Sequence, residues 1–377
     1  MNNQIWLMTS AFKSYSLDEI IVKAKEIKVQ GLEICVFPND GTRTDFVATH
    51  LDYDHFGPDQ AKRLLEQFNR EKLSFSIGAY ENLIGGDPVE RVKNQNHLLK
   101  LIRIAHLCGG DQQDIKVGTF VGYNDELGIQ DNGFEKNLYE YQRIFAPIIK
   151  YAEDLGVTII YENCPMEGWR PKTWPMTYNN LPGTLAARKL MYTLIPSRAH
   201  GETYDPSHDI WQKNNPMEVI RATDMSRVHR VHVNAIRNLK NQSSIYWGGM
   251  FPKQYVDPAL AEKAGVPIAQ HEWDRYAYEA MMPGFGGYDS LDWRDFLETL
   301  MDVGFNKPFV IENEAVNSTH TGNIGAVMQG FQAATLCMAP IVWSLKENEG
   351  YAYQDKRPEY TTETVKDIPV VTMKELI

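Results

Sequence analysis

Short runs of apolar, β-branched and aromatic residues alternate along the chain with longer segments whose apolar residues recur every three or four positions. The short runs predict buried strands, and the longer segments predict amphipathic helices. The predicted strands cover 5–8, 31–37, 74–79, 115–120, 156–162, 201–205, 230–234 and 308–312. The predicted helices cover 58–71, 88–107, 134–155 and 291–303, and one more begins at the capping box of Ser16 and Glu19.

This alternation predicts parallel βαβ units in an α/β protein. Eight strands are the number that closes a (β/α)8 TIM barrel. The alternative is an open doubly wound sheet, which would need a glycine-rich phosphate turn after the first strand. That turn is Thr-Ser-Ala-Phe at 9–12 and contains no glycine. The sequence therefore favours the barrel.

Two connections are much longer than the others, one after the fifth strand (163–181) and one after the seventh (235–290). Long loops that follow barrel strands usually carry the active site. We expect a single barrel domain over 1–345, with 235–290 as a lid-like excursion. The polar tail at 346–377 is expected to wrap the surface or a partner in an oligomer.

Composition narrows the choice of partners. The chain has 38 Lys and Arg against 49 Asp and Glu, a net charge of −11, which disfavours nucleic acid and anionic membranes. The most apolar stretch, 333–343, is half a membrane span long and contains Pro340, so it predicts a buried helix. Four scattered cysteines and an N-terminus without signal-peptide features favour a soluble cytoplasmic protein.

Four of the predicted strands end in a residue that can bind a metal: Glu162, Asp205, His232 and Glu312. The carboxyl ends of barrel strands meet at one rim. Each residue alone is more often a helix cap or an ion-pair partner, but four together on successive strands predict one divalent metal. Three carboxylates and one imidazole suit a site of the Mn²⁺, Mg²⁺ or Co²⁺ type. Glu314 is an alternative to Glu312 as the ligand.

Two further polar residues lie close to these strand ends in sequence. His208 follows Asp205 with Asp-x-x-His spacing, which allows its ring to reach back over the metal as a catalytic or substrate contact. Arg237 follows His232 by five residues and could hold a substrate oxygen. An ordinary loop histidine and a solvated arginine are the alternatives.

The two long loops are rich in aromatic residues, which stack on sugar faces and on planar aglycones. Trp169 in the first loop and Trp247 in the second are candidate substrate contacts, as is the carboxylate of Glu167. The alternatives are a small core within each loop, a subunit interface and, for Glu167, a solvated carboxylate. The remaining aromatics are Trp174, Tyr178, Tyr246, Phe251, Tyr255, Trp273, Tyr276 and Tyr278.

Several motifs resemble those of the sugar phosphate isomerase/epimerase-like group of xylose isomerase-like TIM barrels, over most of 5–343. They are Gly31-Leu32-Glu33, Tyr161-Glu162-Asn163, Asp205-x-x-His208, His232-Val233-Asn234, Gly-Phe-Gly-Gly-Tyr-Asp at 284–289 and Ile311-Glu312-Asn313-Glu314. The resemblance implies that one divalent metal, commonly Mn²⁺, is bound by Glu162, Asp205, His232 and Glu312. It also implies that the two glutamates exchange protons with the carbon next to a carbonyl.

The chain departs from that family in one motif. The usual His-x-Lys-Asp reads His-Val-Asn-Ala at 232–235, so the roles of that lysine and aspartate are in doubt. The predicted third and fourth strands also end without a histidine, which favours one metal over the multi-metal sites of related enzymes. A DNA-repair function, known in one such group, is further disfavoured by the net charge of −11.

The long loop after the seventh strand and the 284–289 motif are similar to the α subunit of bacterial C-glycoside deglycosidases. This finer resemblance implies a Mn²⁺-dependent lyase on 3-oxo-glucosides that works with a smaller β subunit. Glu162, Glu312 or His208 would take the C2 proton, and the aglycone would leave C1 by β-elimination. The alternatives are a ketose or inosose epimerase or isomerase and a non-catalytic binding barrel.

Overall fold

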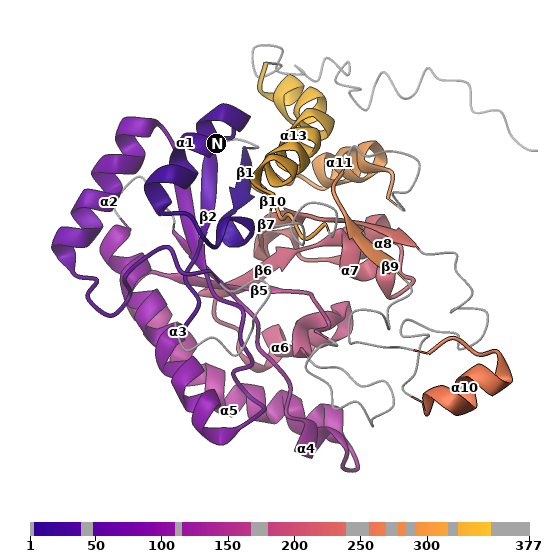
Figure 1. Ribbon diagram of the computed structural model, residues 1–377. Coiled ribbons are helices and arrows are strands. Elements are labelled where there is room, and N and C mark those ends of the chain that lie inside the picture. The colour runs from indigo at the N-terminus through magenta and orange to yellow at the C-terminus, as the bar shows by residue number, and fades with distance from the viewer. Residues whose placement is uncertain are drawn as a thin grey trace, which may run out of the picture.

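A computed structural model describes residues 4–38, 48–109, 115–166, 180–238, 256–268, 278–283, 291–315 and 323–347. Eight parallel strands form a closed barrel in the order β1-β10-β7-β6-β5-β4-β3-β2 (Figure 1). They are β1 (Ile5–Met8), β2 (Gly31–Cys35), β3 (Ser74–Gly78), β4 (Lys116–Thr119), β5 (Thr158–Glu162), β6 (His200–Tyr204), β7 (Val228–Val233) and β10 (Phe309–Ile311). The predicted (β/α)8 TIM barrel is confirmed.

Helices surround this barrel and cover the outward faces of its strands (Figure 1). The α-helices of the ring and its connections are α1 (Leu17–Ile27), α2 (Pro58–Glu71), α3 (Pro88–Cys108), α4 (Asp125–Gly128), α5 (Gly133–Asp154), α6 (Leu185–Leu194), α7 (Pro206–Trp211), α8 (Pro216–Ala222), α11 (Trp293–Asp302) and α13 (Ile324–Glu347). The short 3-10 helices are η1 (Thr9–Phe12), η3 (Leu181–Gly183) and η4 (Met225–Arg227). The predicted capping box is present, because Ser16 and Glu19 each accept a hydrogen bond from the other's backbone.

The excursion after β7 contains more regular structure than the sequence suggested. It begins with β8 (Ala235–Asn238) and returns through β9 (Tyr278–Met281), which pair as an antiparallel ribbon. The short helix α10 (Pro258–Ala264) lies between them in sequence and away from the barrel in Figure 1. Arg237 is therefore in a strand, opposite Glu279, and the expectation of a loop position was wrong.

The apolar stretch at 333–343 belongs to α13, which is longer than predicted. Among the described residues, α13 is the one helix long and apolar enough to cross a membrane by length and composition. Core helices of barrels pass the same test, and α13 packs against β1, β10, α1 and α11 in the outer ring. Met338 and Val342 are fully buried and Leu336 is 72% exposed, so the predicted buried helix is buried on one face only.

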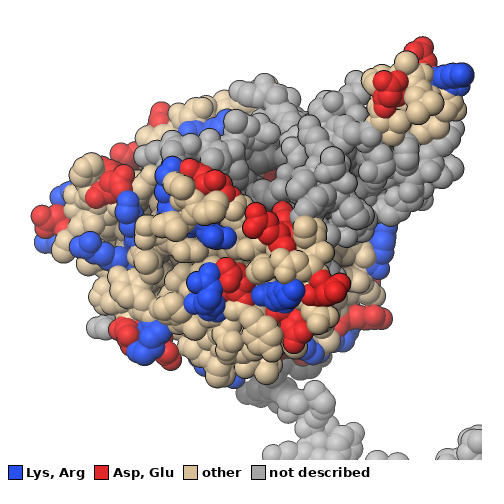
Figure 2. All heavy atoms as spheres, turned by 90° about the horizontal axis from the view of Figure 1, so that it is seen from below, with Lys and Arg blue, Asp and Glu red and all other residues tan. Residues whose placement is uncertain are grey.

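Charge is distributed evenly over the face shown in Figure 2. Lys and Arg side chains alternate there with Asp and Glu, and the described part of this face has no large basic patch. The proposed domain boundary at 345 falls within α13, and the division into a barrel and a tail stays a prediction.

Candidate metal centre and active site

The four predicted metal ligands come together at the carboxyl end of the barrel. Glu162 ends β5, His232 lies near the end of β7, and Asp205 and Glu312 directly follow β6 and β10. Nδ1 of His232 is 3.0 Å from Oε1 of Glu162 and 3.3 Å from Oε2 of Glu312. His208, at the start of α7, has its Nε2 3.3 Å from Oε1 of Glu162 and 3.4 Å from Oδ2 of Asp205.

These side chains form two overlapping groups that could hold a metal ion. One ligand atom from each of Glu162, His232 and Glu312 lies within 4.8 Å of the others, and the same holds for Glu162, Asp205 and His208. Oδ2 of Asp205 is buried and accepts no hydrogen bond from the described residues. Nε2 of His208 faces this oxygen only at 3.4 Å, and a buried carboxylate oxygen without a hydrogen bond is costly, so a cation there would stabilise it. The donor set of carboxylate oxygens and imidazole nitrogen fits a divalent metal.

Asparagine side chains hold two of the strand ends in place. The side chain of Asn163 accepts a hydrogen bond from the backbone N–H of Asp205 at 2.7 Å and donates one to the backbone carbonyl of Asp205 at 3.0 Å. These two bonds tie the end of β5 to the end of β6. Asn180 donates to the carbonyls of Glu162 and Cys164 at 3.2 and 2.6 Å. The backbone that carries two carboxylates is thereby fixed before any ligand arrives, which is the arrangement a preorganised site requires.

The histidines and Glu162 stabilise one another's charged forms. Burial opposes the charge of Glu162, but the neighbouring His232 and His208 outweigh it and lower the pKa of this carboxyl. Burial likewise opposes the charge of His232, but Glu162 and Glu33 raise its pKa well above the usual value. The pKa of His208 is raised well above its usual value too, by Cys164 and Asp205 against the effect of burial.

The other carboxyl groups are shifted in the opposite direction. Burial raises the pKa of Asp205 to about 7, despite the attraction of His208. Burial and the charge of Glu162 raise the pKa of Glu312. Glu314 accepts a hydrogen bond from Asn234 at 3.0 Å, and burial and Glu312 raise its pKa to about 8. Too many acidic groups meet here for all of them to ionise without a cation.

Sequence reasoning missed charged residues directly below this rim. Glu33 of β2 was noted only as part of a motif, yet its Oε2 lies 2.9 Å from Nε2 of His232. Arg230 of β7 was not singled out, yet its Nη2 lies 2.8 Å from Oε1 of Glu33. Both residues lie on inward-facing positions of otherwise apolar strands, and that placement is the signal that could have identified them.

The remaining candidates belong to the segments 163–181 and 235–290. Trp169, Trp247 and Glu167 fall outside the described residues, as does the side chain of Arg237. Their roles as substrate contacts stay predictions.

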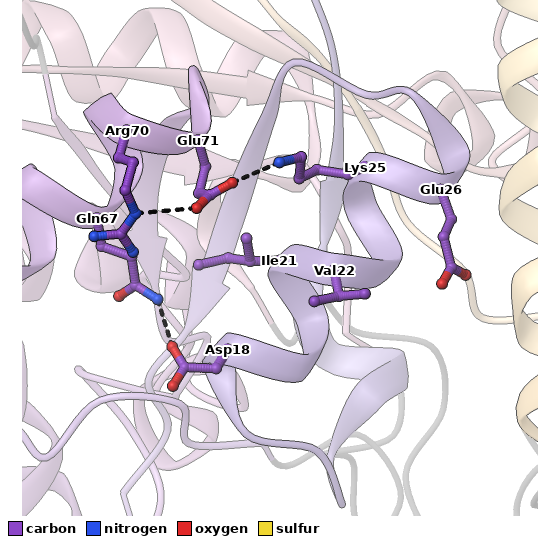
Figure 3. A pocket seen from close by; sticks show the side chains of 8 residues that line it. All are labelled: Asp18, Ile21, Val22, Lys25, Glu26, Gln67, Arg70 and Glu71. Atoms are coloured by element: carbon purple, nitrogen blue, oxygen red, sulfur yellow. Dashed lines mark hydrogen bonds and ion pairs between the residues drawn. The ribbon is translucent and has the colours of Figure 1, made fainter.

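A shallow groove between α1 and α2 lies on the outside of the barrel (Figure 3). Glu71 of α2 pairs with Lys25 of α1 across it at 2.6 Å and with its own neighbour Arg70 at 3.2 Å. These ion pairs are partly exposed and therefore weak, and the groove is lined by the outer surfaces of two ring helices. It belongs to the packing of the ring and not to the site at the rim.

The barrel and its rim define a class of protein: a TIM-barrel protein with a buried acidic centre that could hold a divalent metal. The model of the family described as "Xylose isomerase-like TIM barrel" matches residues 21–333, most of the chain. This chain belongs to that family, as its motifs suggested. No curated protein matches the sequence.

Solved structures with the same fold include several sugar-modifying enzymes. A D-psicose 3-epimerase from Clostridium cellulolyticum H10 is 14% identical, with a TM-score of 0.57 over 90% of this chain and 99% of its own. A 3-keto-D-glucoside 4-epimerase from E. coli is 12% identical, with a TM-score of 0.53 over 87% and 99%. The IolI protein with a bound zinc atom is 12% identical, with a TM-score of 0.58 over 90% and 98%. At these identities the likeness establishes the fold alone.

Proposed function

We propose that this protein is a divalent-metal-dependent enzyme that removes the proton next to a sugar carbonyl. The observation that carries the proposal is the arrangement of Glu162 and Glu312 around His232. The two carboxylates come from β5 and β10, which are separated by β6 and β7, and both face Nδ1 of His232. Two buried carboxylates beside one candidate cation site are the equipment for proton removal and proton return on opposite sides of a substrate.

Each group has a definite task in this reaction. A bound divalent cation would supply Lewis acidity, which makes the hydrogen next to a chelated carbonyl easier to remove. Asp205 and His232 would hold the cation together with the two glutamates. Glu162, Glu312 or His208 would take the proton, since each places a carboxylate oxygen or a ring nitrogen at the same buried rim.

The finer proposal is a lyase that acts on a 3-oxo-C-glucoside. Loss of the C2 proton places an electron pair between C1 and C2, and the bond from C1 to the aglycone breaks. The aglycone carbon takes the electron pair and then a proton, so no oxidant or reductant is consumed. The aromatic residues at 163–181 and 235–290 support a bulky aglycone, as does the resemblance to C-glycoside deglycosidase α subunits. This proposal includes a smaller β subunit, an oligomeric state and Trp169, Trp247, Glu167 and Arg237 as substrate contacts.

The second candidate is epimerisation or isomerisation of a free sugar or an oxo-sugar. The structural neighbours support it, because two of them are a ketose 3-epimerase and a 3-keto-glucoside 4-epimerase. In this case the same carboxylates would remove and return a proton, and no carbon–carbon bond would break. Family membership and these neighbours support sugar chemistry under both candidates.

Mass spectrometry of a 3-oxo-C-glucoside, incubated with the protein in D₂O, separates the two candidates. With Mn²⁺ present and a small subunit from the native host added, we expect release of free aglycone that stops with EDTA. Uptake of deuterium into intact glycoside would instead favour epimerisation. If Mn²⁺ is present and neither aglycone release nor deuterium uptake is observed, proton removal from this substrate class is contradicted.

Variants identify the groups that carry the reaction. Glu162→Gln, Glu312→Gln and His208→Asn test the three candidate bases separately. Glu202→Gln is the matched control, because Glu202 is also a buried carboxylate on a barrel strand but pairs with Arg188 away from the rim. Equal losses of activity in all four variants would show that the loss comes from changing a buried group and not from removing a catalytic one.

A further inference from the structure

A polar layer fills the inside of the barrel directly below the rim. The guanidinium of Arg230 lies at its centre, with its Nη2 2.8 Å from Glu33 Oε1 and its Nη1 donating to Ser76 at 2.7 Å. Its Nε donates to Thr203 at 2.9 Å, and its Nη2 also contacts the Tyr80 hydroxyl at 3.1 Å. These contacts link β7 to β2, β3 and β6, and both charged side chains are at most 2% exposed.

The glycines of neighbouring strands leave the space for this layer. A Cβ atom at Gly118 of β4 would lie 2.1 Å from Arg230 Nη2 and 2.5 Å from the Tyr80 oxygen. A Cβ atom at Gly78 of β3 would lie 2.7 Å from Glu33 Oε1. TIM-barrel interiors are usually filled by branched apolar side chains, and a buried ion pair seldom stabilises a fold more than those would. The layer therefore calls for an explanation other than stability.

The explanation lies in what Glu33 contacts. While Oε1 of Glu33 faces Arg230, Oε2 lies 2.9 Å from Nε2 of His232. A carboxylate only accepts hydrogen bonds, so each ring nitrogen carries a hydrogen where it faces a carboxylate, and a bound metal would replace the hydrogen on Nδ1. Nδ1 is then the nitrogen left to face Glu162 and Glu312, where the metal would lie. The Tyr80 ring also packs edge-on beside the His232 ring, with centroids 6.1 Å apart.

We propose that Glu33 is a positioning residue that fixes the orientation of His232, so that Nδ1 binds the metal, and that Arg230 holds Glu33 in place. The proposal rests on the metal-dependent function above and deepens it. Carboxylates that orient a metal-binding histidine typically contribute 10- to 100-fold to metal affinity. Arg230 suits its task because its planar fork contacts four side chains at once, which a lysine ammonium could not reproduce.

Metal affinity, measured by isothermal titration calorimetry with Mn²⁺, tests the proposal without an activity assay. Glu33→Gln keeps the size of the side chain but removes the charge that faces both Arg230 and His232. Gly118→Ala removes no polar group and instead places a methyl group where the guanidinium lies. We expect each variant to bind Mn²⁺ about 10- to 100-fold more weakly than the wild type.

Two controls separate the possible outcomes. Glu202→Gln breaks the buried Arg188–Glu202 pair, whose side chains are 1% and 3% exposed and lie away from the rim, so its Mn²⁺ affinity should stay within about twofold of wild type. His232→Ala should abolish tight binding. Wild-type affinity in both Glu33→Gln and Gly118→Ala would overturn the positioning role, and so would an equal loss in Glu202→Gln. Equal binding by wild type and His232→Ala would instead show that the proposed metal site itself is wrong.

Discussion

The structure contains two buried arginine–glutamate pairs that look alike and differ in what they contact. Arg230 and Glu33 lie inside the barrel at 2.8 Å, and Arg188 and Glu202 lie at 2.9 Å, with Arg188 coming from a ring helix. All four side chains are at most 3% exposed. The inner pair contacts His232 of the rim, whereas Arg188 of the other pair donates to the carbonyl of Pro182.

The pKa values of the two glutamates reflect this difference. Burial alone would raise the pKa of both glutamates, but Arg230 and His232 together lower the pKa of Glu33. Glu202 has Arg188 as its cationic partner, and burial prevails, so its pKa is raised. Neither the charge nor the burial of such a pair therefore indicates a function. What indicates a function is the group that the pair contacts, which is His232 for the inner pair.

The largest effect is expected from the rim itself. Glu162→Gln removes the charge and the basicity of the carboxylate that contacts both His232 and His208, so turnover should fall by about 10²- to 10⁴-fold, the usual contribution of a general base. Steady-state kinetics measures the fall, with Glu202→Gln as the control. Activity within a few-fold of wild type in Glu162→Gln would contradict a direct role of this carboxylate.

Removal of the metal from the site at the rim should lower the stability of the protein. A metal at 100 times its dissociation constant stabilises the folded state by about 2.7 kcal/mol. EDTA should therefore lower the melting temperature of the wild type and of Glu202→Gln, measured by calorimetry, by the same amount. His232→Ala should show no such decrease. A decrease of wild-type size in His232→Ala would place the stabilising metal elsewhere.

Replacing each pair completely with apolar residues sharpens the comparison. Such replacements are often neutral or stabilising by about 1–4 kcal/mol, because no charge is left unpaired. Arg188→Met with Glu202→Leu should keep both the stability and the Mn²⁺ affinity. Arg230→Met with Glu33→Leu should keep the fold, by urea unfolding, but bind Mn²⁺ about 10- to 100-fold more weakly. Unchanged affinity in the inner double variant would remove the distinction between the pairs.

The last prediction concerns the pH dependence of metal binding. The metal requires neutral His232 and an ionised Asp205, but the pKa of His232 is raised well above its usual value and that of Asp205 to about 7. Protons therefore compete with the metal at low pH, and Mn²⁺ affinity should rise about tenfold per pH unit for each proton released. Above pH 7 Asp205 is already ionised, so it should no longer contribute to the rise of Mn²⁺ affinity with pH. Calorimetry in buffers of different ionisation enthalpy counts the protons, and a flat profile between pH 5 and 8 would contradict these shifts.

Much of the fold could be predicted because the barrel strands carry unusually clear signals. Most of them are short apolar runs between helical segments, and the second, for example, was predicted at 31–37 and lies at Gly31–Cys35. The β8–β9 ribbon was missed because its strands are only four residues long, and their pairing joins segments about 40 residues apart. The polar sequence around Arg237 therefore resembled a loop.

The site divides in the same way. Glu162 and His232 could be expected to meet, since strand ends of a barrel converge whatever their order. The contact between Glu33 and His232 could not, because it depends on which oxygen of Glu33 faces Arg230 and on the space above Gly118. Such side-chain directions follow from packing among distant strands, on which a linear sequence pattern gives no information.

The most direct test of the account is a crystal structure of the protein soaked in Mn²⁺, with the metal located by its anomalous scattering. The account predicts one strong peak at the rim, bounded by Glu162, Asp205 and Glu312 and by Nδ1 of His232, with Nε2 still directed at Glu33. A peak at another position, no peak, or a metal bound through Nε2 of His232 would contradict it.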